Sequence, residues 1–561
     1  MSNRTGSPTG VVADPRPGPR SDSGVGPGRR RTGTALRVVS HLAAEVPLVV
    51  LAVIELARGW RPVYDNADLA LRSFQVFSSH SPLVGHQMAV SAGSRAVFGP
   101  GPIQNWLLAV PVRIDPAQGA LWGALVAVVV AVALTVEAGS AVAGWRGAAV
   151  ASGSVLVLLL ARTDVALDVA WNVWFGLCFL LAAVGSSVAA ATGRLRWWPV
   201  AVVAATVTVQ CQAAFAPPAV AVCVVAPVLG IAVRRHRSGA VEWAWLVVGL
   251  GVGVAGWIAP AAQQAADHPG NLTLIARAAR GSGPSIGWPA ALRAFGGATR
   301  VPPSWAHALP ASGTARYVAV AGSFSGPAGW GVVVLAALTV VSVVAWWAGR
   351  TDLAACAAVT LALSGGAVAA IAVVPGSQFL VVGYLGALWV PVATAVWITA
   401  AWAAWELVAV ARRRWWPSPG RAESGTLGGG ARIERTVAVV VAVGLLLGSG
   451  GVVRRGLDGM DGTTPTLAGW TAVHAAAAGA DAAARVAPSG PFRLEVAGPT
   501  SATQFAVLTG VAYLLVTRGL DPRPDPPVTW ATFGHPPVHG PVVVLELPGG
   551  SGAVRAQLRR S

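Results

Sequence analysis

The chain has 561 residues, of which 54% are hydrophobic and 11% are charged. Because globular domains carry about a quarter charged residues, this composition excludes an ordinary water-soluble fold. The net charge is +17, but the basic residues show neither zinc-ligand spacing nor a basic helix interleaved with aromatic residues, so we expect no nucleic acid partner. All 40 basic residues are arginine, which with the many Ala, Gly, Val and Pro residues is typical of a GC-rich bacterial genome.

Residues 1–35 are rich in Arg, Pro, Gly and Ser and have no apolar period, which predicts a disordered tail. Apolar segments of about 20 residues follow, the length that crosses ~30 Å of hydrocarbon as a helix. We therefore predict an α-helical polytopic membrane domain over residues 36–454. Its eleven predicted membrane segments are 38–57, 117–138, 147–162, 168–191, 198–214, 218–233, 241–259, 329–348, 352–374, 381–410 and 435–454.

Arginine residues assign the connections between these segments to two sides of a plasma membrane. They gather on alternate connections, which the positive-inside rule places in the cytoplasm. These arginines are at positions 29–31, 146, 194, 196, 234, 235, 237, 350 and 412–414. The N-terminus is then cytoplasmic, and the loops 59–116 and 260–328, with everything after residue 455, lie on the extracytoplasmic side.

The first outer loop begins with the polar sequence YDNADLALRSF at residues 64–74. If this part is helical, Asp65, Asp68 and Arg72 share one helix face, because they lie three and four positions apart. One interpretation makes Asp65, or Asp68 as a second candidate, a general base that deprotonates an acceptor hydroxyl near the outer leaflet. The other makes Asp65 the N-cap of a helix and Asp68 the ordinary partner of Arg72.

The same loop continues with further residues able to bind phosphate. His80, His86 and Arg95 are candidates, although histidines in a loop are more often simply solvated. Residues 94–116 then combine Gly and Pro with an aromatic and apolar segment that returns to the membrane. That pattern is typical of a re-entrant or interfacial elbow.

Polar residues also cluster where the chain enters the predicted segment 168–191. Asp164, Asp168 and Asn172 lie within two turns of one another, and polar residues inside a membrane are costly and often functional. Alternatively, both aspartates stay at the interface, where Trp171 and Trp174 form part of an aromatic belt.

Two glutamines and three glutamates complete the polar candidates of the membrane domain. Gln210 and Gln212, at the outer end of the fifth segment, suit hydrogen bonds either to a sugar or to a neighbouring helix. Glu45, Glu55 and Glu406 are the acids that a proton-coupled transporter would need, and only Glu45 lies deep in its segment. The four cysteines lie in apolar segments without ligand spacing, so no metal site is predicted.

The last hundred residues alternate helical and strand patterns. Residues 466–488 and 500–518 read as helices, and FRLEV (492–496) and PVVVLEL (541–547) read as strands. We therefore predict a small extracytoplasmic α/β domain over residues 455–561.

Short motifs occur in the first outer loop in a defined order. An acidic residue opens the loop, and an Arg-containing helix, a PLxG segment and a GPGP elbow follow, here as Asp65, Arg72, residues 82–85 and residues 98–102. In this order the chain resembles actinobacterial polytopic glycosyltransferases of the GT-C superfamily, of the mannosyl- or arabinosyltransferase kind. The later similarities are Trp171 with Asn172, the pair Gln210 and Gln212, PGN at 269–271, and the C-terminal domain. Three positions depart from the family pattern: Phe98 where His is usual, Val173 where Pro is common, and Gln212 where His is frequent.

The resemblance implies an inverting transfer of a sugar from a polyprenyl-phosphate donor to a cell-envelope glycan or glycolipid, at the outer face of the bilayer. Asp65 would be the catalytic base, and Arg72 or Arg95 would stabilise the leaving phosphate. The resemblance identifies no certain cofactor, and a role for a divalent cation stays open. Two other classes also stay open: a transporter or flippase, which favours two halves of similar hydropathy that we do not find, and a non-catalytic envelope scaffold.

Overall fold

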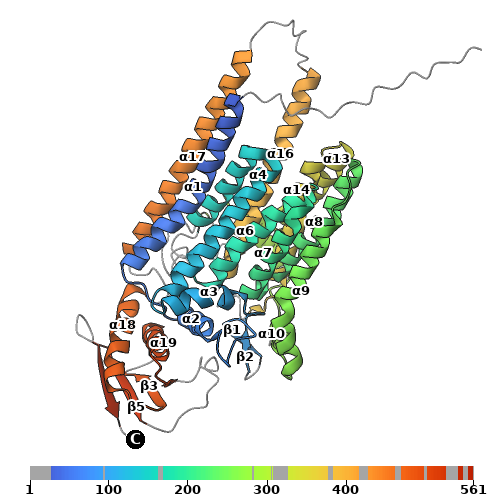
Figure 1. The fold of residues 1–561 in the computed structure, drawn as a ribbon. Helices are drawn as coiled ribbons and strands as arrows, with labels where there is room; N and C mark the ends of the chain where they lie inside the picture. Colours follow the sequence, from blue (N-terminus) through green and yellow to red (C-terminus); the bar gives the residue numbers. More distant parts are fainter. Residues whose placement is uncertain are drawn as a thin grey trace, which may run out of the picture.

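The computed structural model describes residues 27–92, 95–161, 169–280, 283–304, 306, 326–376, 383–415, 427–461, 469–497, 502–525, 541–547 and 554–559. It shows a bundle of long helices with a small α/β domain at one end (Figure 1). The helices of the bundle and its connections are α1 (Pro27–Ala57), α2 (Asp65–Gln75), α3 (Ile103–Ile114), α4 (Gly119–Ala161), α6 (Asn172–Ala191), α7 (Trp198–Cys211), α8 (Ala216–His236), α9 (Trp243–Ala266), α10 (Asn271–Arg280), α11 (Trp288–Thr299), α13 (Ala328–Trp347), α14 (Thr351–Ala372), α16 (Trp389–Trp415) and α17 (Leu427–Asp461).

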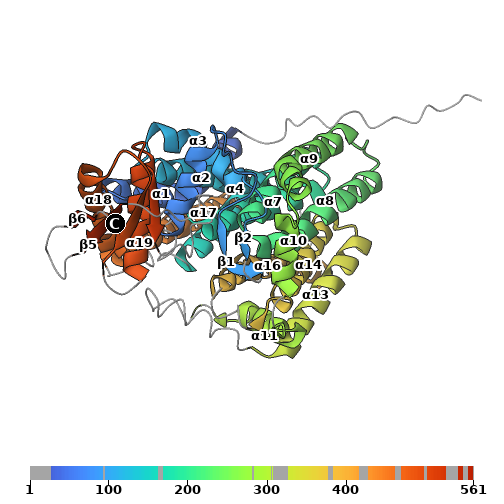
Figure 2. The same cartoon turned by 90° about the horizontal axis from the view of Figure 1, so that it is seen from below.

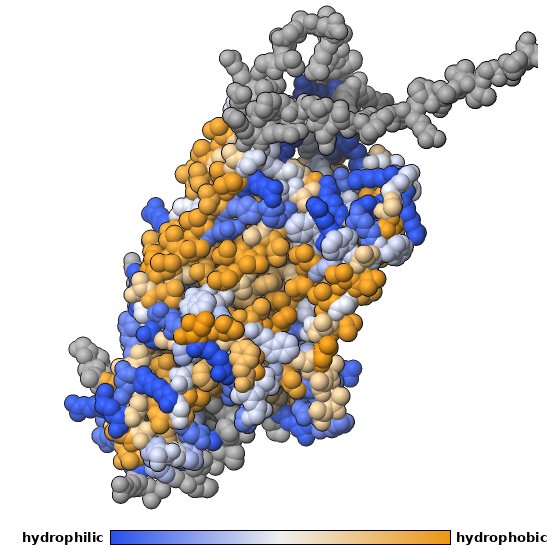
Figure 3. All heavy atoms as spheres, in the orientation of Figure 1, coloured by the Kyte–Doolittle hydropathy of each residue, from blue (hydrophilic) through white to orange (hydrophobic). Residues whose placement is uncertain are grey.

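The bundle confirms a polytopic membrane fold. Within the described residues, nine helical segments are long and apolar enough to cross a membrane. Apolar side chains cover a broad band across the middle of the face shown in Figure 3, and hydrophilic side chains gather toward both ends. On α1, for example, Val38, Leu42 and Val53 are about half exposed, as expected for side chains that meet lipid instead of water.

The longest of these nine segments, α4, contains two of the eleven predicted crossings. Its backbone leaves the helical conformation at Ala143 and Gly144, where Gly144 has φ +60°. A Cβ built on Gly139 would lie 2.4 Å from the carbonyl oxygen of Gly147. In a straight helix residues eight apart are about 12 Å apart along the axis, so this close approach means that the chain folds back on itself.

The predicted fifth segment, 198–214, is shorter than expected. Helix α7 has 14 residues, which extend about 21 Å, less than the ~30 Å hydrocarbon core. It packs against α6, α8 and α9, and most of its side chains are buried. We infer that α7 is an internal helix whose C-terminal residue Gln210 meets the first connection.

The connections fall at two ends of the bundle (Figures 1 and 2). Helices α2, α3 and α10, the hairpin of β1 (Gln87–Ala92) and β2 (Arg95–Phe98), and the C-terminal domain lie at one end, here named the loop end. The start of α1 and the end of α16 lie at the other. The described elements of the loop end all belong to segments predicted to be extracytoplasmic, and they share one end, opposite the N-terminus of α1.

The C-terminal domain contains a four-stranded sheet and two helices. The strand order is β4 (Pro522–Asp525), β3 (Phe492–Val496), β5 (Val542–Glu546) and β6 (Arg555–Arg559), with β3 parallel to β4 and β5. Helices α18 (Gly469–Val486) and α19 (Ala502–Val516) pack on each other and on this sheet. Both helices and the strands at 492–496 and 541–547 match the prediction, whereas β4 and β6 were not predicted.

Two predicted domain limits need correction. Helix α1 begins at Pro27, so the expected end of the tail at residue 35 falls inside a helix. Helix α17 extends to Asp461, so the C-terminal domain begins after that residue and not at 455. In both cases polar residues continue a helix beyond its apolar part, which a hydropathy pattern does not detect.

Candidate functional site

Helix α2 presents its two carboxylates differently. Asp65 is the first helical residue and its side chain is exposed, while the N-cap position is occupied by Tyr64, so the interpretation that made Asp65 the N-cap was wrong. Asp68 has both oxygens engaged: Arg72 Nε lies 3.3 Å from Oδ1, and the Gln87 N–H donates to Oδ2 over 3.1 Å. Of the two carboxylates, Asp65 is the more exposed, so a substrate reaches it more easily.

Arg72 is buried at the centre of the loop-end contacts. It is 6% exposed, and its guanidinium carbon lies 4.7 Å from the centre of the Phe98 ring. A cation over an aromatic face is attracted by the negative potential of the ring. Phe98, at which the sequence departs from the family pattern, thus forms one wall around the Asp68–Arg72 pair.

His86 is buried beside the same pair and is 8% exposed. Burial of the imidazole lowers the pKa of His86 to about 4. The negative charge of Asp68 partly offsets this shift, and the positive charge of Arg72 adds to it. Its imidazole is therefore neutral at pH 7. In this conformation His86 can donate a hydrogen bond to phosphate but supplies no charge to it.

The lowered pKa of the buried His86 leads us to predict that the stability of the folded protein depends on pH. Its ordinary pKa of 6.5 applies in the unfolded chain, so between pH 6.5 and 4 the unfolded state binds more protons and stability falls as pH falls. The shift corresponds to a loss on the order of 3 kcal/mol in the free energy of unfolding. We expect His86→Gln to flatten this dependence in denaturant unfolding of the detergent-solubilised protein, while the exposed His80, changed to Gln, leaves it intact. Equal slopes in both variants would contradict the assignment.

The PLVG and FGPGP segments cross each other at short range. The Gly85 N–H donates to the Gly99 carbonyl over 3.0 Å, and the Gly99 N–H donates to the His86 carbonyl over 2.8 Å. A Cβ built on Gly101 would lie 2.2 Å from Gln210 Oε1. Glycine is needed at this position because the elbow presses directly on the end of α7. The predicted elbow is thus the point where the loop meets the bundle.

Asn271, in the PGN motif, holds the elbow from another loop. Its Oδ1 accepts the Phe98 N–H over 3.0 Å, and its Nδ2 donates to the Phe98 carbonyl, also over 3.0 Å. Its own N–H donates to Gln263 Oε1 over 2.9 Å. The motif was visible in the sequence, but this role depends on a contact across 173 residues, which no local pattern predicts.

Gln210 and Asn172 bond to backbone groups of neighbouring segments. Gln210 Oε1 accepts the Ile103 N–H over 3.1 Å and its Nε2 donates to the Gly256 carbonyl over 2.6 Å. Asn172 Nδ2 donates to the Cys211 carbonyl over 3.0 Å. Both side chains are buried and hold α3, α6, α7 and α9 together. For Gln210 the sequence allowed hydrogen bonds either to a sugar or to a neighbouring helix, and in this structure the side chain bonds to neighbouring helices.

The remaining predicted site residues lie apart from this cluster. His80 is exposed after the end of α2, with Nδ1 3.2 Å from Ser79 Oγ, and Arg95 is exposed at the start of β2. Asp164 and Asp168 lie outside the described residues. The β1–β2 hairpin itself was missed, although the small residues between two short apolar runs were a signal for it.

No group of three His, Cys, Asp or Glu side chains in the described part of the chain is arranged to hold a metal ion. The polar side chains of the loop end instead pair with one another or form hydrogen bonds with backbone groups. A role for a divalent cation therefore remains a prediction made from the sequence.

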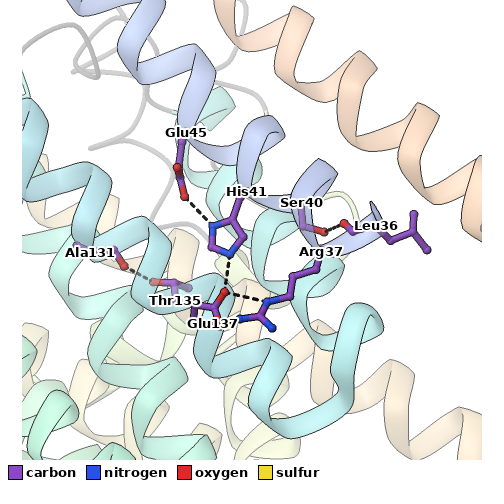
Figure 4. A network of polar contacts seen from close by, with 8 residues as sticks. All are labelled: Leu36, Arg37, Ser40, His41, Glu45, Ala131, Thr135 and Glu137. Carbon is purple, nitrogen blue, oxygen red and sulfur yellow. Dashed lines mark hydrogen bonds and ion pairs between the residues drawn. The ribbon is translucent and has the colours of Figure 1, made fainter. Parts of the chain in front are cut away.

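A second polar cluster lies between α1 and α4, and sequence reasoning found only one of its members. Figure 4 shows His41 between Glu45 on its own helix and Glu137 on α4, with Arg37 reaching the same Glu137 carboxylate. His41 Nδ1 lies 2.8 Å from Glu45 Oε1, His41 Nε2 lies 2.8 Å from Glu137 Oε1, and Arg37 Nε donates to that oxygen over 2.9 Å. The spacing of four between Arg37, His41 and Glu45 was the available signal.

The imidazole of His41 bridges two carboxylates. Each of its ring nitrogens has a carboxylate oxygen at hydrogen-bond distance, Glu45 Oε1 at Nδ1 and Glu137 Oε1 at Nε2. The network therefore places two basic and two acidic side chains between α1 and α4.

The network should stabilise the packing of α1 on α4. We expect Glu137→Gln to lower the free energy of unfolding by about 1–2 kcal/mol, because it weakens charge-assisted hydrogen bonds at a partly exposed site. Thr135→Val on the same helix is the control, since the Thr135 hydroxyl donates to the Ala131 carbonyl of α4 itself. Unfolding in SDS–detergent mixtures measures both, and equal effects would contradict a bridge between the helices.

The described geometry defines a polytopic membrane protein with a structured, partly polar loop end. No protein-family model and no curated protein matches the chain. Among solved structures the chain is similar to ArnT from Cupriavidus metallidurans in the apo state, at 15% identity, over 89% of this chain and 92% of that chain, with a TM-score of 0.39.

Proposed function

We propose that the protein is a membrane glycosyltransferase of the GT-C kind. It transfers a sugar from a polyprenyl-phosphate donor to a cell-envelope glycan or glycolipid at the loop end of the bundle, which we take as extracytoplasmic, with inversion at the anomeric carbon. Asp65 is the general base. The order of motifs in the first outer loop supports this assignment, since each of them contributes to one connected structure.

The observation that carries the proposal is the exposure of the Asp65 side chain at the start of α2, at the loop end. Asp68 is held by Arg72 and by the Gln87 N–H, so it fixes the helix against β1. Asp65 begins the same helix with an exposed side chain at the loop end. An alcohol is a poor nucleophile, and a carboxylate within hydrogen-bond reach removes its proton as the bond between C1 and the phosphate oxygen breaks.

Stabilisation of the leaving phosphate requires a cation that a substrate can reach. Arg95 is exposed at the start of β2, whereas Arg72 is buried and paired with Asp68. We therefore assign phosphate contact to Arg95 first, with His80 as the other exposed candidate at this end. Arg72 supports the site indirectly, because its pairing with Asp68 fixes α2.

The test is transfer of radiolabelled sugar from a panel of polyprenyl-phosphate donors to an envelope lipid or glycan extract. Purified wild-type protein should form labelled product, and Asp65→Asn should form almost none. Product formed equally by both proteins would remove Asp65 from the mechanism. Absence of product with every donor would contradict the proposed enzyme class.

A transporter is the second candidate, and the network of Arg37, His41, Glu45 and Glu137 is the observation that favours it. Proton-coupled transporters use such acids, but the described contacts of this network join α1 to α4, and Glu406 pairs with Arg350 elsewhere. Proton movement into liposomes that Glu45→Gln abolishes, with no sugar transfer, would favour the transporter. If both activities are absent, a non-catalytic scaffold is the remaining interpretation.

A further inference from the structure

The C-terminal domain contacts both ends of the connection that carries Asp65. Helix α19 lies beside α2 at the loop end (Figures 1 and 2). A Cβ built on Gly510 of α19 would lie 2.9 Å from Val63 Cγ1, so α19 touches the segment just before α2 begins. At the other end of the connection, the buried Tyr513 donates its hydroxyl hydrogen to the Pro116 carbonyl over 2.7 Å. Sequence position alone gave no reason to join these segments.

Tyr64, immediately before Asp65, has a backbone conformation that an L-residue rarely adopts. Its φ is 55° and its ψ is −133°. Such a conformation is strained and persists only where its surroundings impose it. Here the Tyr64 N–H donates to Thr509 Oγ1 over 2.7 Å, and the Tyr64 ring meets Phe505 edge to face with centroids 5.2 Å apart. Both contacts come from α19.

The hydrogen bonds have a fixed direction. Thr509 donates its hydroxyl hydrogen to the Ala506 carbonyl over 2.7 Å, which leaves the oxygen to accept from Tyr64. The Tyr64 carbonyl in turn accepts the Ala67 N–H over 3.0 Å and so closes the first turn of α2. Thr509 is 5% exposed, so water does not readily replace it. A change at Thr509 is therefore transmitted to the turn that begins with Asp65.

We infer that the C-terminal domain positions the catalytic base. Thr509 and Phe505 are positioning residues: they hold Tyr64 in its strained conformation and thereby set the direction of the Asp65 side chain. This inference rests on the proposed function, because it takes Asp65 as the base. The domain then contributes to the chemical step itself, through a contact that lies outside the membrane bundle.

The experiment compares three threonine variants of the full-length protein. Thr509→Val removes the acceptor oxygen and keeps the shape, whereas Thr509→Ser keeps the oxygen. Thr517→Val is the matched control, because the Thr517 hydroxyl also donates to a carbonyl three residues earlier, Leu514, without reaching Tyr64. We measure kcat and the donor KM for sugar transfer, and hydrogen exchange of the backbone amides of residues 64–68.

Thr509→Val should lower kcat about 10- to 100-fold with an unchanged donor KM, because misplacing a reacting group lowers the rate without weakening donor binding. Exchange at residues 64–68 should become faster, and Thr509→Ser and Thr517→Val should resemble wild type. With an active wild type, unchanged kcat in Thr509→Val, or an equal loss in Thr517→Val, would overturn the inference.

Failure of the proposed function gives a different result. If wild type transfers no sugar from any donor, Asp65 loses its catalytic role, and the exchange measurement still decides the contact. Faster exchange at residues 64–68 in Thr509→Val alone would support control of α2 by the C-terminal domain. Unchanged hydrogen exchange at residues 64–68 would show that the C-terminal domain does not control the conformation of α2.

Discussion

Replacing Asp65 with asparagine should lower kcat for sugar transfer about 100- to 10,000-fold, the usual contribution of a positioned general base. Asparagine keeps the size of the side chain but cannot take a proton from the acceptor hydroxyl. The donor KM should change little, since Asp65 acts on the acceptor. The measurement is steady-state sugar transfer by wild type and Asp65→Asn, with kcat and the donor KM determined for both proteins.

Asp68→Asn provides the control on the same helix. This change removes the partner of Arg72 and should lower stability, but the folded fraction should keep most of its activity, because both Asp68 oxygens already bond within the protein. Activity is therefore compared per folded molecule at low temperature. A large loss in Asp68→Asn together with an active Asp65→Asn would reverse the two roles.

Most membrane segments could be predicted from the sequence because the hydrocarbon core requires long apolar helices. Length and hydropathy place the two halves of α4 correctly, since the turn at Ala143 and Gly144 separates two such segments. The same criterion fails for α7, whose apolar residues face other helices instead of lipid. It also fails at Pro27 and Asp461, where polar turns extend α1 and α17 beyond the membrane.

The candidate site was predictable only where its contacts are local. The pair of Asp68 and Arg72 follows from their spacing of four on a helix. The contact of Arg72 with Phe98 and the hydrogen bonds of Asn271 to the elbow join separate segments, so spacing holds no signal for them. The same is true of Glu137, whose partner His41 lies 96 residues earlier in the chain.

Replacing Arg72 with methionine should lower the free energy of unfolding by about 3 kcal/mol or more. Methionine fills similar space, but it leaves the Asp68 carboxylate without its cation in a largely buried place, where side-chain exposures are 8% for Arg72 and 18% for Asp68. Removing one partner of a buried pair costs far more than the pair contributes, because the remaining charge is desolvated and uncompensated. Denaturant unfolding in detergent measures the loss.

The double variant Asp68→Asn/Arg72→Met separates an unpaired charge from lost packing. It should be more stable than Arg72→Met alone, because no uncompensated carboxylate remains. With the loss measured for Asp68→Asn alone, the cycle of variants gives the coupling between the two residues. Arg113→Met is the matched control: Arg113 also lies over an aromatic ring, 4.9 Å from the centre of Phe74, but it is exposed. A loss in Arg72→Met no larger than in Arg113→Met would mean that water reaches Asp68, and α2 would then need another anchor to hold Asp65 at the loop end.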